Sequence, residues 1–208
     1  MAFNKYAGIF PIILEILAII GVFIPLGIGI IDMGGLAGWK IRFSSSPLGI
    51  ITREPIGILG PFLESIIGPI VEIFIPTLTY NINPAIIGYI MLLLSLLIII
   101  FGIVELRKSE SIAYPIVNIV LAIIFLILPV LSYLVFAFNA FPEYLKSYST
   151  IKALVSTYYF PSIAYLPMAI DQFPSIGFYL IVISQIVVIM TSTAALIINA
   201  IQKKKGKI

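Results

Sequence analysis

The feature that most constrains this chain is a series of long apolar segments that are almost free of charge. They cover residues 6–31, 84–104, 112–138 and 174–201. Each is long enough for a helix to cross a hydrocarbon core, which needs about 20 residues. Of the 208 residues, 61% are hydrophobic and only 10% are charged, against roughly a quarter charged in a soluble domain. The sequence therefore predicts an integral membrane protein in a lipid bilayer.

The apolar segments are continuous and do not alternate with polar residues. The isoleucine cluster Ile98–Ile100 has strand propensity, but a membrane barrel would need alternation in segments of about ten residues. We therefore expect an all-α fold. It would be a four-transmembrane-helix bundle forming a single domain over residues 1–208.

The connections between the segments differ in length and charge. Two long loops, 32–83 and 139–173, alternate with a short inner loop at 105–111, and a basic tail covers 202–208. Cationic residues are concentrated in the short segments, which favours their retention in the cytoplasm. We expect a multi-pass protein of the plasma membrane with both termini cytoplasmic and both long loops outside. The cations that support this are Lys5, Arg107, Lys108, Lys203, Lys204, Lys205 and Lys207.

The first apolar segment contains residues that interrupt helices. Pro25 is expected to kink or end the helix, and Gly27 and Gly29 weaken the same stretch. Pro129 predicts a kink in the third segment. A secretory signal peptide is the alternative interpretation of the first segment. We favour a retained span, because the run is too long for a signal-peptide core.

The first long loop contains an apolar stretch at 56–79 that is interfacial, re-entrant or spanning. Two repeated units, 60–67 and 68–75, each begin with a Gly-Pro pair, and each contains one glutamate, Glu64 or Glu72. We expect two short helices that lie on the membrane surface or dip into it, because a charge inside the bilayer is costly. Trp39, beside Lys40, is expected to be an interfacial anchor.

The second long loop contains an apolar stripe with helical spacing. It is formed by Tyr144, Tyr148, Ile151, Val155 and Tyr158. Intervals of four and three residues place them on one helix face. This amphipathic helix would lie on the lipid surface, on the first long loop or on a partner protein.

A few polar residues lie inside the predicted spans. Glu15 is the acidic one, and an ionisable group at that depth is a candidate functional residue that binds a cation or relays a proton. The alternative is that Glu15 pairs with Lys5 or another basic residue near the inner side. Asn118 and Gln185 are further candidates, although hydrogen bonding between helices is the commoner role for such side chains.

Several function classes are excluded or unsupported. There is no cysteine and no histidine, which excludes disulfides, thiolate chemistry and histidine-bound metals. No phosphate-binding, dinucleotide-binding or hydrolase motif is found. We therefore expect no catalytic residue, no metal or other cofactor, no nucleic-acid binding and no enzyme activity.

The layout of four spans with a longer first and a shorter second outer loop resembles tetraspan proteins such as claudins and tetraspanins. Gly35-Leu36-Ala37-Gly38-Trp39 is loosely similar to the outer-loop signature of claudins, but the cysteines of both families are absent. The isoleucine-rich, cysteine-free composition is typical of a thermophile.

Two function hypotheses follow. The first is a non-catalytic accessory or scaffold subunit, or a tetraspan-like surface protein, that meets a protein partner or itself through the outer loops. The second is a small transporter or channel with Glu15 in the pathway.

Overall fold

The computed structural model describes most of the chain and is the basis of all that follows. The side chains of Pro84, Ile151, Val155, Tyr158 and Lys205 are not described, and the predictions for Trp39, Glu64 and Glu72 lie outside the described residues. The described residues are 7–32, 40–57, 60–62, 65–66, 69, 84–108, 111–158 and 168–205.

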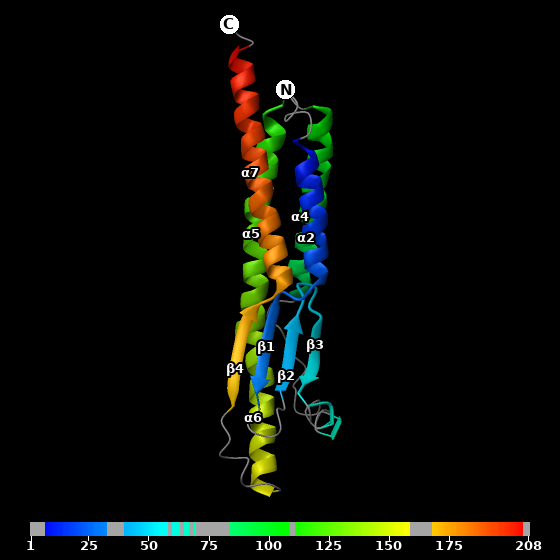
Figure 1. The fold of residues 1–208 in the computed structure, drawn as a ribbon, viewed down its shortest axis with the longest axis vertical. Helices are drawn as coiled ribbons and strands as arrows, with labels where there is room; N and C mark the ends of the chain where they lie inside the picture. Colours follow the sequence, from blue (N-terminus) through cyan, green and yellow to red (C-terminus); the bar gives the residue numbers. More distant parts are fainter. Residues whose placement is uncertain are drawn as a thin grey trace.

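The largest part of the molecule is a bundle of four helices (Figure 1). They are α2 (Ile9–Phe23), α4 (Pro84–Arg107), α5 (Ala113–Val135) and α7 (Ile176–Lys205). The helices form a ring, because α2 and α5 each pack against both α4 and α7. The mostly helical architecture is therefore confirmed.

Within the described residues, three helices are long and apolar enough to cross a membrane. They are Ala85–Arg107, Ala113–Leu154 and Ile176–Lys204. The fourth, α2, has 15 residues and spans about 22 Å at 1.5 Å per residue, less than a hydrocarbon core of about 30 Å. The structure thus agrees with a membrane location, but three helices rather than four meet the length for a span.

The first helix is shorter than predicted. It ends at Phe23, and Ile24 is already extended, because a helix does not continue readily into a proline such as Pro25. Residues Gly27–Asp32 form a strand instead. The helix expected over 6–31 is therefore wrong at its C-terminal end, where proline and the glycines prevail over hydrophobicity.

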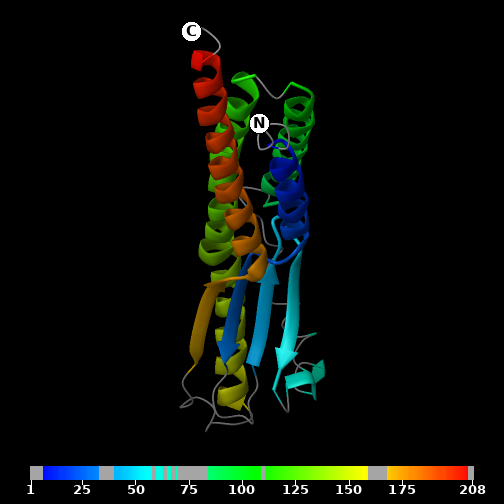
Figure 2. The same cartoon turned by 45° about the horizontal axis from the view of Figure 1, so that its top comes forward.

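A four-stranded antiparallel sheet lies at one end of the bundle (Figures 1 and 2). The strands are β1 (Gly27–Asp32), β2 (Lys40–Ser45), β3 (Ile51–Ile56) and β4 (Ala169–Pro174), in the order β3-β2-β1-β4. The all-α prediction is therefore wrong for the end of the first predicted span and for parts of the two regions taken as long loops. The signal was the polar–apolar alternation of Lys40-Ile41-Arg42-Phe43, which is typical of a half-buried strand.

The third helix continues far past its predicted end at 138. α5 passes through a short π-helix, η1 (Phe136–Ala140), into α6 (Phe141–Tyr158). Ala113–Leu154 has 42 residues and is about 63 Å long, roughly twice the thickness of a hydrocarbon core. The π-helix precedes Pro142, which has no N–H to donate to the normal helical ladder. The region 139–173, which was predicted to be a loop, therefore begins as a helix.

The sheet and α6 share a core, and together they are called the sheet module below. Phe43 of β2 is fully buried and contacts the rings of Phe141, Tyr144 and Tyr148 from α6. Gly29 of β1 lies so close to the Phe141 ring that a Cβ atom would collide with it. The absence of a side chain at Gly29 therefore allows the helix to approach the sheet this closely.

The opposite end of the bundle holds the start of α2, the end of α7 and the α4–α5 connection. Gly8 lies against the Gly102 carbonyl of α4, and Asn199 Nδ2 donates to the Ser111 carbonyl at 3.0 Å. The sheet module and the chain ends thus lie at opposite ends of the molecule (Figure 1).

Candidate functional site

The interior of the bundle contains a carboxyl–amide pair that joins α2 and α7. Gln185 Nε2 donates to Glu15 Oε1 at 2.9 Å, and both side chains are fully buried. Ser95 of α4, also fully buried, lies beside the same carboxyl group. Three helices therefore converge on Glu15, in the middle of α2.

A second carboxyl–amide pair joins α4 and α5. Asn118 Nδ2 donates to Glu105 Oε2 at 3.1 Å, and Glu105 is only 2% exposed. The sequence placed Glu105 in the charged inner loop, whereas the structure places it in the last turns of α4, facing the bundle. Two of the four neighbouring helix pairs, α2–α7 and α4–α5, thus each have one such link within the described residues.

Several buried polar atoms of the bundle have no hydrogen-bond partner. In the Glu15 cluster they are Glu15 Oε2, Gln185 Oε1 and Ser95 Oγ. Asn118 Oδ1 and Ser192 Oγ are further examples. A buried polar atom without a partner costs about 1–3 kcal/mol, so the accumulation around Glu15 makes this cluster a candidate site.

The structure brings together two of the predicted intramembrane residues, Glu15 and Gln185, and places Asn118 in a separate pair. In the described residues, the partner of Glu15 is an amide and not the basic residue considered from the sequence. Ser95 and Glu105 were missed. Their positions relative to Glu15 and Asn118 depend on how the helices pack, which the spacing of residues along the sequence does not reveal.

The two tyrosines of the predicted stripe whose side chains the structure describes pack against the sheet. Tyr144 stacks on Phe43 with ring centroids 4.5 Å apart, and Tyr148 is fully buried. Of the three surfaces considered, the first long loop is the one these two tyrosines contact. α6 does contain the predicted helical segment, although the side chains of Ile151, Val155 and Tyr158 are not described.

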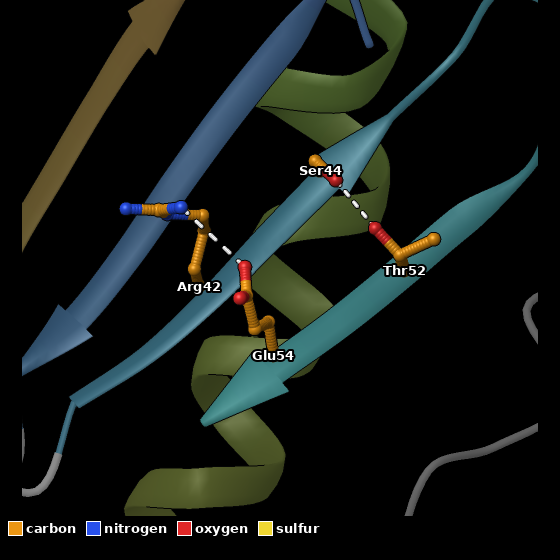
Figure 3. A network of polar contacts seen from close by, with 4 residues as sticks. All are labelled: Arg42, Ser44, Thr52 and Glu54. Carbon is orange, nitrogen blue, oxygen red and sulfur yellow. Dashed lines mark hydrogen bonds and ion pairs between the residues drawn. The ribbon is translucent and has the colours of Figure 1, made fainter. Parts of the chain in front are cut away.

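The other face of the sheet, turned away from α6, carries charged and polar side chains among apolar ones. Figure 3 shows Arg42, Ser44, Thr52 and Glu54 on it, with α6 behind the strands. Arg42 Nη1 donates to Glu54 Oε2 at 3.4 Å, and the Ser44 and Thr52 hydroxyls are hydrogen bonded to each other. This surface is called the open face below, and Ile28, Ile30, Asp32, Lys40, Asp171 and Phe173 also belong to it by strand register.

The open face also contains the strongest ion pair of the sheet. Lys40 Nζ lies 2.8 Å from Asp32 Oδ2. The hydrogen bond to Asp32 and the charge of that carboxylate raise the pKa of Lys40, and Asp171 on β4 acts in the same direction. Charges of opposite sign on the three strands β1, β2 and β4 therefore attract one another on this face.

The two edges of the sheet differ in chemistry. β3 carries Arg53, Glu54 and Pro55, and charge and proline protect an edge from pairing with other strands. β4 carries one charge, Asp171, and Ala169–Phe173 are all exposed. β4 is therefore the less protected edge.

The two regions offer different chemical groups. Within the described residues there is no group of three or more histidine, cysteine, aspartate or glutamate side chains that could hold a metal ion. The bundle offers a buried carboxyl with amide and hydroxyl neighbours. The sheet module offers a charged surface and an accessible strand edge.

Comparison with protein-family models, curated proteins and solved structures finds no match to this chain.

Proposed function

We propose that this protein is a non-catalytic accessory subunit, in which a lipid-embedded helix bundle holds the sheet module outside the membrane to bind a protein partner. The observation that carries the proposal is the direct connection between the two parts. α2 leads into β1 after three residues, β4 leads into α7 after one residue, and α5 continues through η1 into α6. No flexible linker separates anchor and module in these three connections.

The membrane part of the proposal rests on the outer surface of the bundle. All four helices turn large apolar side chains outward, including Ile13 of α2 and Met190 of α7, 53% and 65% exposed. Such a surface suits lipid and not water. We propose that α2 also crosses the bilayer, together with its flanking residues, and that both chain ends are cytoplasmic in the plasma membrane.

The docking part of the proposal rests on β4. An extended segment of a partner protein would add antiparallel to this edge, and the open face would contribute charged contacts. A second copy in the same membrane suits the edge less well. Two copies in one membrane would be related by a twofold axis along the membrane normal. Such an axis would place the two β4 strands parallel to each other, whereas every strand pair in this sheet is antiparallel.

The test combines crosslinking with an edge mutation. A photo-crosslinking residue at position 172 of β4 should give one discrete protein adduct in native membranes, and the same residue at position 190 of α7 should give lipid adducts. Gln172→Lys, which places a charge on the edge, should abolish both the adduct and comigration with a larger assembly after mild-detergent extraction. The matched variant Ser149→Lys, at an exposed position of α6 outside β4 and the open face, should retain them. A protein that migrates alone, or an adduct that survives Gln172→Lys, would refute the proposed docking edge.

A second candidate function is a small transporter or channel with Glu15 in the pathway. The observation in its favour is the group of unpaired oxygens at Glu15, Gln185 and Ser95. If Glu15 carries an ion or a proton across the membrane, flux into liposomes should be lost in Glu15→Gln and retained in Glu105→Gln. Unchanged flux in Glu15→Gln would exclude Glu15 from the pathway.

A further inference from the structure

The Glu15–Gln185 pair is joined by one hydrogen bond and leaves two buried oxygens without a partner among the described residues. Gln185 Nε2 donates to Glu15 Oε1, and the two remaining oxygens, Glu15 Oε2 and Gln185 Oε1, have no partner. Both of these atoms are acceptors while the carboxyl group is ionised. They can bond to each other only if a proton lies between them.

We infer that Glu15 binds a proton and holds it in a cyclic carboxyl–amide pair with Gln185. The proton on Glu15 Oε2 would be donated to Gln185 Oε1, while Gln185 Nε2 continues to donate to Glu15 Oε1. One proton thereby satisfies both unpaired oxygens. The Ser95 hydroxyl beside the same carboxyl group has a single proton to donate, so it could satisfy only one of them. This inference stands independently of the proposed docking function, because it concerns the bundle and not the sheet module.

The surroundings of Glu15 favour a neutral carboxyl group. It is fully buried between helices whose outer faces are apolar, and an isolated buried charge is far more costly than a hydrogen-bonded neutral group. Within the described residues, the polar side chains that act on it are Gln185 from α7 and Ser95 from α4. Glu105, the other buried carboxyl group, is paired with Asn118 of α5.

A metal cation fits this cluster less well than a proton. The cluster supplies three oxygens without partners, from one carboxyl, one amide and one hydroxyl group. Hard cations such as calcium take six to eight oxygen ligands, often several of them carboxylates. A proton needs only the two atoms that the pair already presents.

The bound proton would act as a structural ligand of the fold. α2 continues into β1 and α7 follows β4, and these two strands are neighbours in the sheet. A two-bond link between α2 and α7 therefore fixes the helices that carry the centre and one edge of the sheet. Loss of the proton would place the ionised Glu15 oxygen against the Gln185 carbonyl oxygen and separate the helices.

The experiment is infrared spectroscopy of the full-length protein in lipid bilayers at neutral pH. Wild-type protein should show a protonated carboxyl C=O band that Glu15→Gln removes and Glu105→Gln leaves in place. Gln185→Leu, which keeps Glu15 but removes its partner, should shift this band to higher frequency. If the Glu15→Gln difference spectrum shows only carboxylate bands, Glu15 is ionised and the inference is wrong.

Thermal unfolding in the same bilayers gives a second, independent readout. Glu15→Gln, which is neutral and can still form amide–amide bonds, should melt close to wild type, and Glu15→Leu should melt clearly lower. Replacing choline chloride by sodium or potassium chloride should not change the wild-type melting temperature. Stabilisation of wild type but not of Glu15→Gln by one of these ions would identify a cation site and overturn the proton assignment.

Discussion

The bundle and the sheet module differ in the polar groups that they bury and in their outer surfaces. Both have apolar cores, but the bundle also buries Glu15, Gln185 and Asn118, whereas the core of the sheet module is centred on the aromatic rings of Phe43 and Tyr148. The outer surface of the bundle is apolar, and the open face of the sheet carries charged residues. The two parts of one chain thus differ most in the polarity of their surfaces.

This difference agrees with the proposal that the two parts have different solvents, lipid around the bundle and water around the sheet module. Inside a membrane bundle, a polar group forms hydrogen bonds with other protein groups, away from the lipid. Inside a water-exposed sheet module, an apolar group is removed from water. The polarity of the outer surface changes where the backbone passes from helix to strand. There Leu26 N–H donates to the Ser45 carbonyl and Ser175 N–H donates to the Leu26 carbonyl, both at 2.8 Å. The predictions below test the contrast, beginning with the largest expected effect.

Removing the central ring of the sheet module should unfold that module but leave the bundle intact. Phe43→Ala should cost about 3–5 kcal/mol, because it leaves a cavity between β2 and α6. Limited proteolysis in detergent should then cleave within the module while the bundle helices remain protected. Phe173→Ala is the control, since Phe173 is 41% exposed on β4. Equal sensitivity of the two variants would contradict a core centred on Phe43.

A charge placed on the outside of the bundle should act very differently from the same charge on the sheet. Met190→Lys, in the middle of α7, should cost roughly 2.5–3.5 kcal/mol if that surface faces lipid, and it should reduce the amount of membrane-inserted protein. Thr52→Lys on the open face should leave insertion unchanged. If both variants insert normally, the outer surface of the bundle does not face hydrocarbon.

The close approach of sheet and helix at Gly29 should be sensitive to a single methyl group. Gly29→Ala drives a Cβ atom into the Phe141 ring, and overpacking of this kind costs about 1–3 kcal/mol. The melting temperature of the module should fall accordingly. Gly60→Ala should have no such effect, because its Cβ would have no neighbour nearer than 3.5 Å. A module that tolerates Gly29→Ala as well as Gly60→Ala would show that α6 can shift away from β1.

The smallest effect is expected for the ion pair on the open face. Lys40→Ala should change the melting temperature little, because exposed ion pairs contribute little. The raised pKa of Lys40 fixes the sign of the pH dependence. The contribution is present below the unfolded-state pKa and is lost as the pH rises through the higher folded-state pKa. Melting curves of wild type and Lys40→Ala should therefore differ most at neutral pH and converge in strong alkali. Divergence with rising pH would contradict this assignment.

The sequence alone predicted a membrane location, with which the three long apolar helices agree, and the approximate positions of several helices. Long runs without charge can be buried only in lipid or in a large core, and the segments at 84–104 and 174–201 correspond closely to α4 and α7. It also indicated where the first helix is interrupted, since Pro25 and the glycines that follow it act through the local backbone alone.

The tertiary structure decided everything that depends on pairing between distant residues. β1 and β4 are separated by more than a hundred residues and are strands because they pair with each other and with β2. Glu15 and Gln185 are 170 positions apart in sequence and meet only because α2 and α7 pack side by side. Periodicity reports which face of an element is apolar, but it does not report which element covers that face. For this reason the stripe on α6 was predicted, and its burial against Phe43 was not.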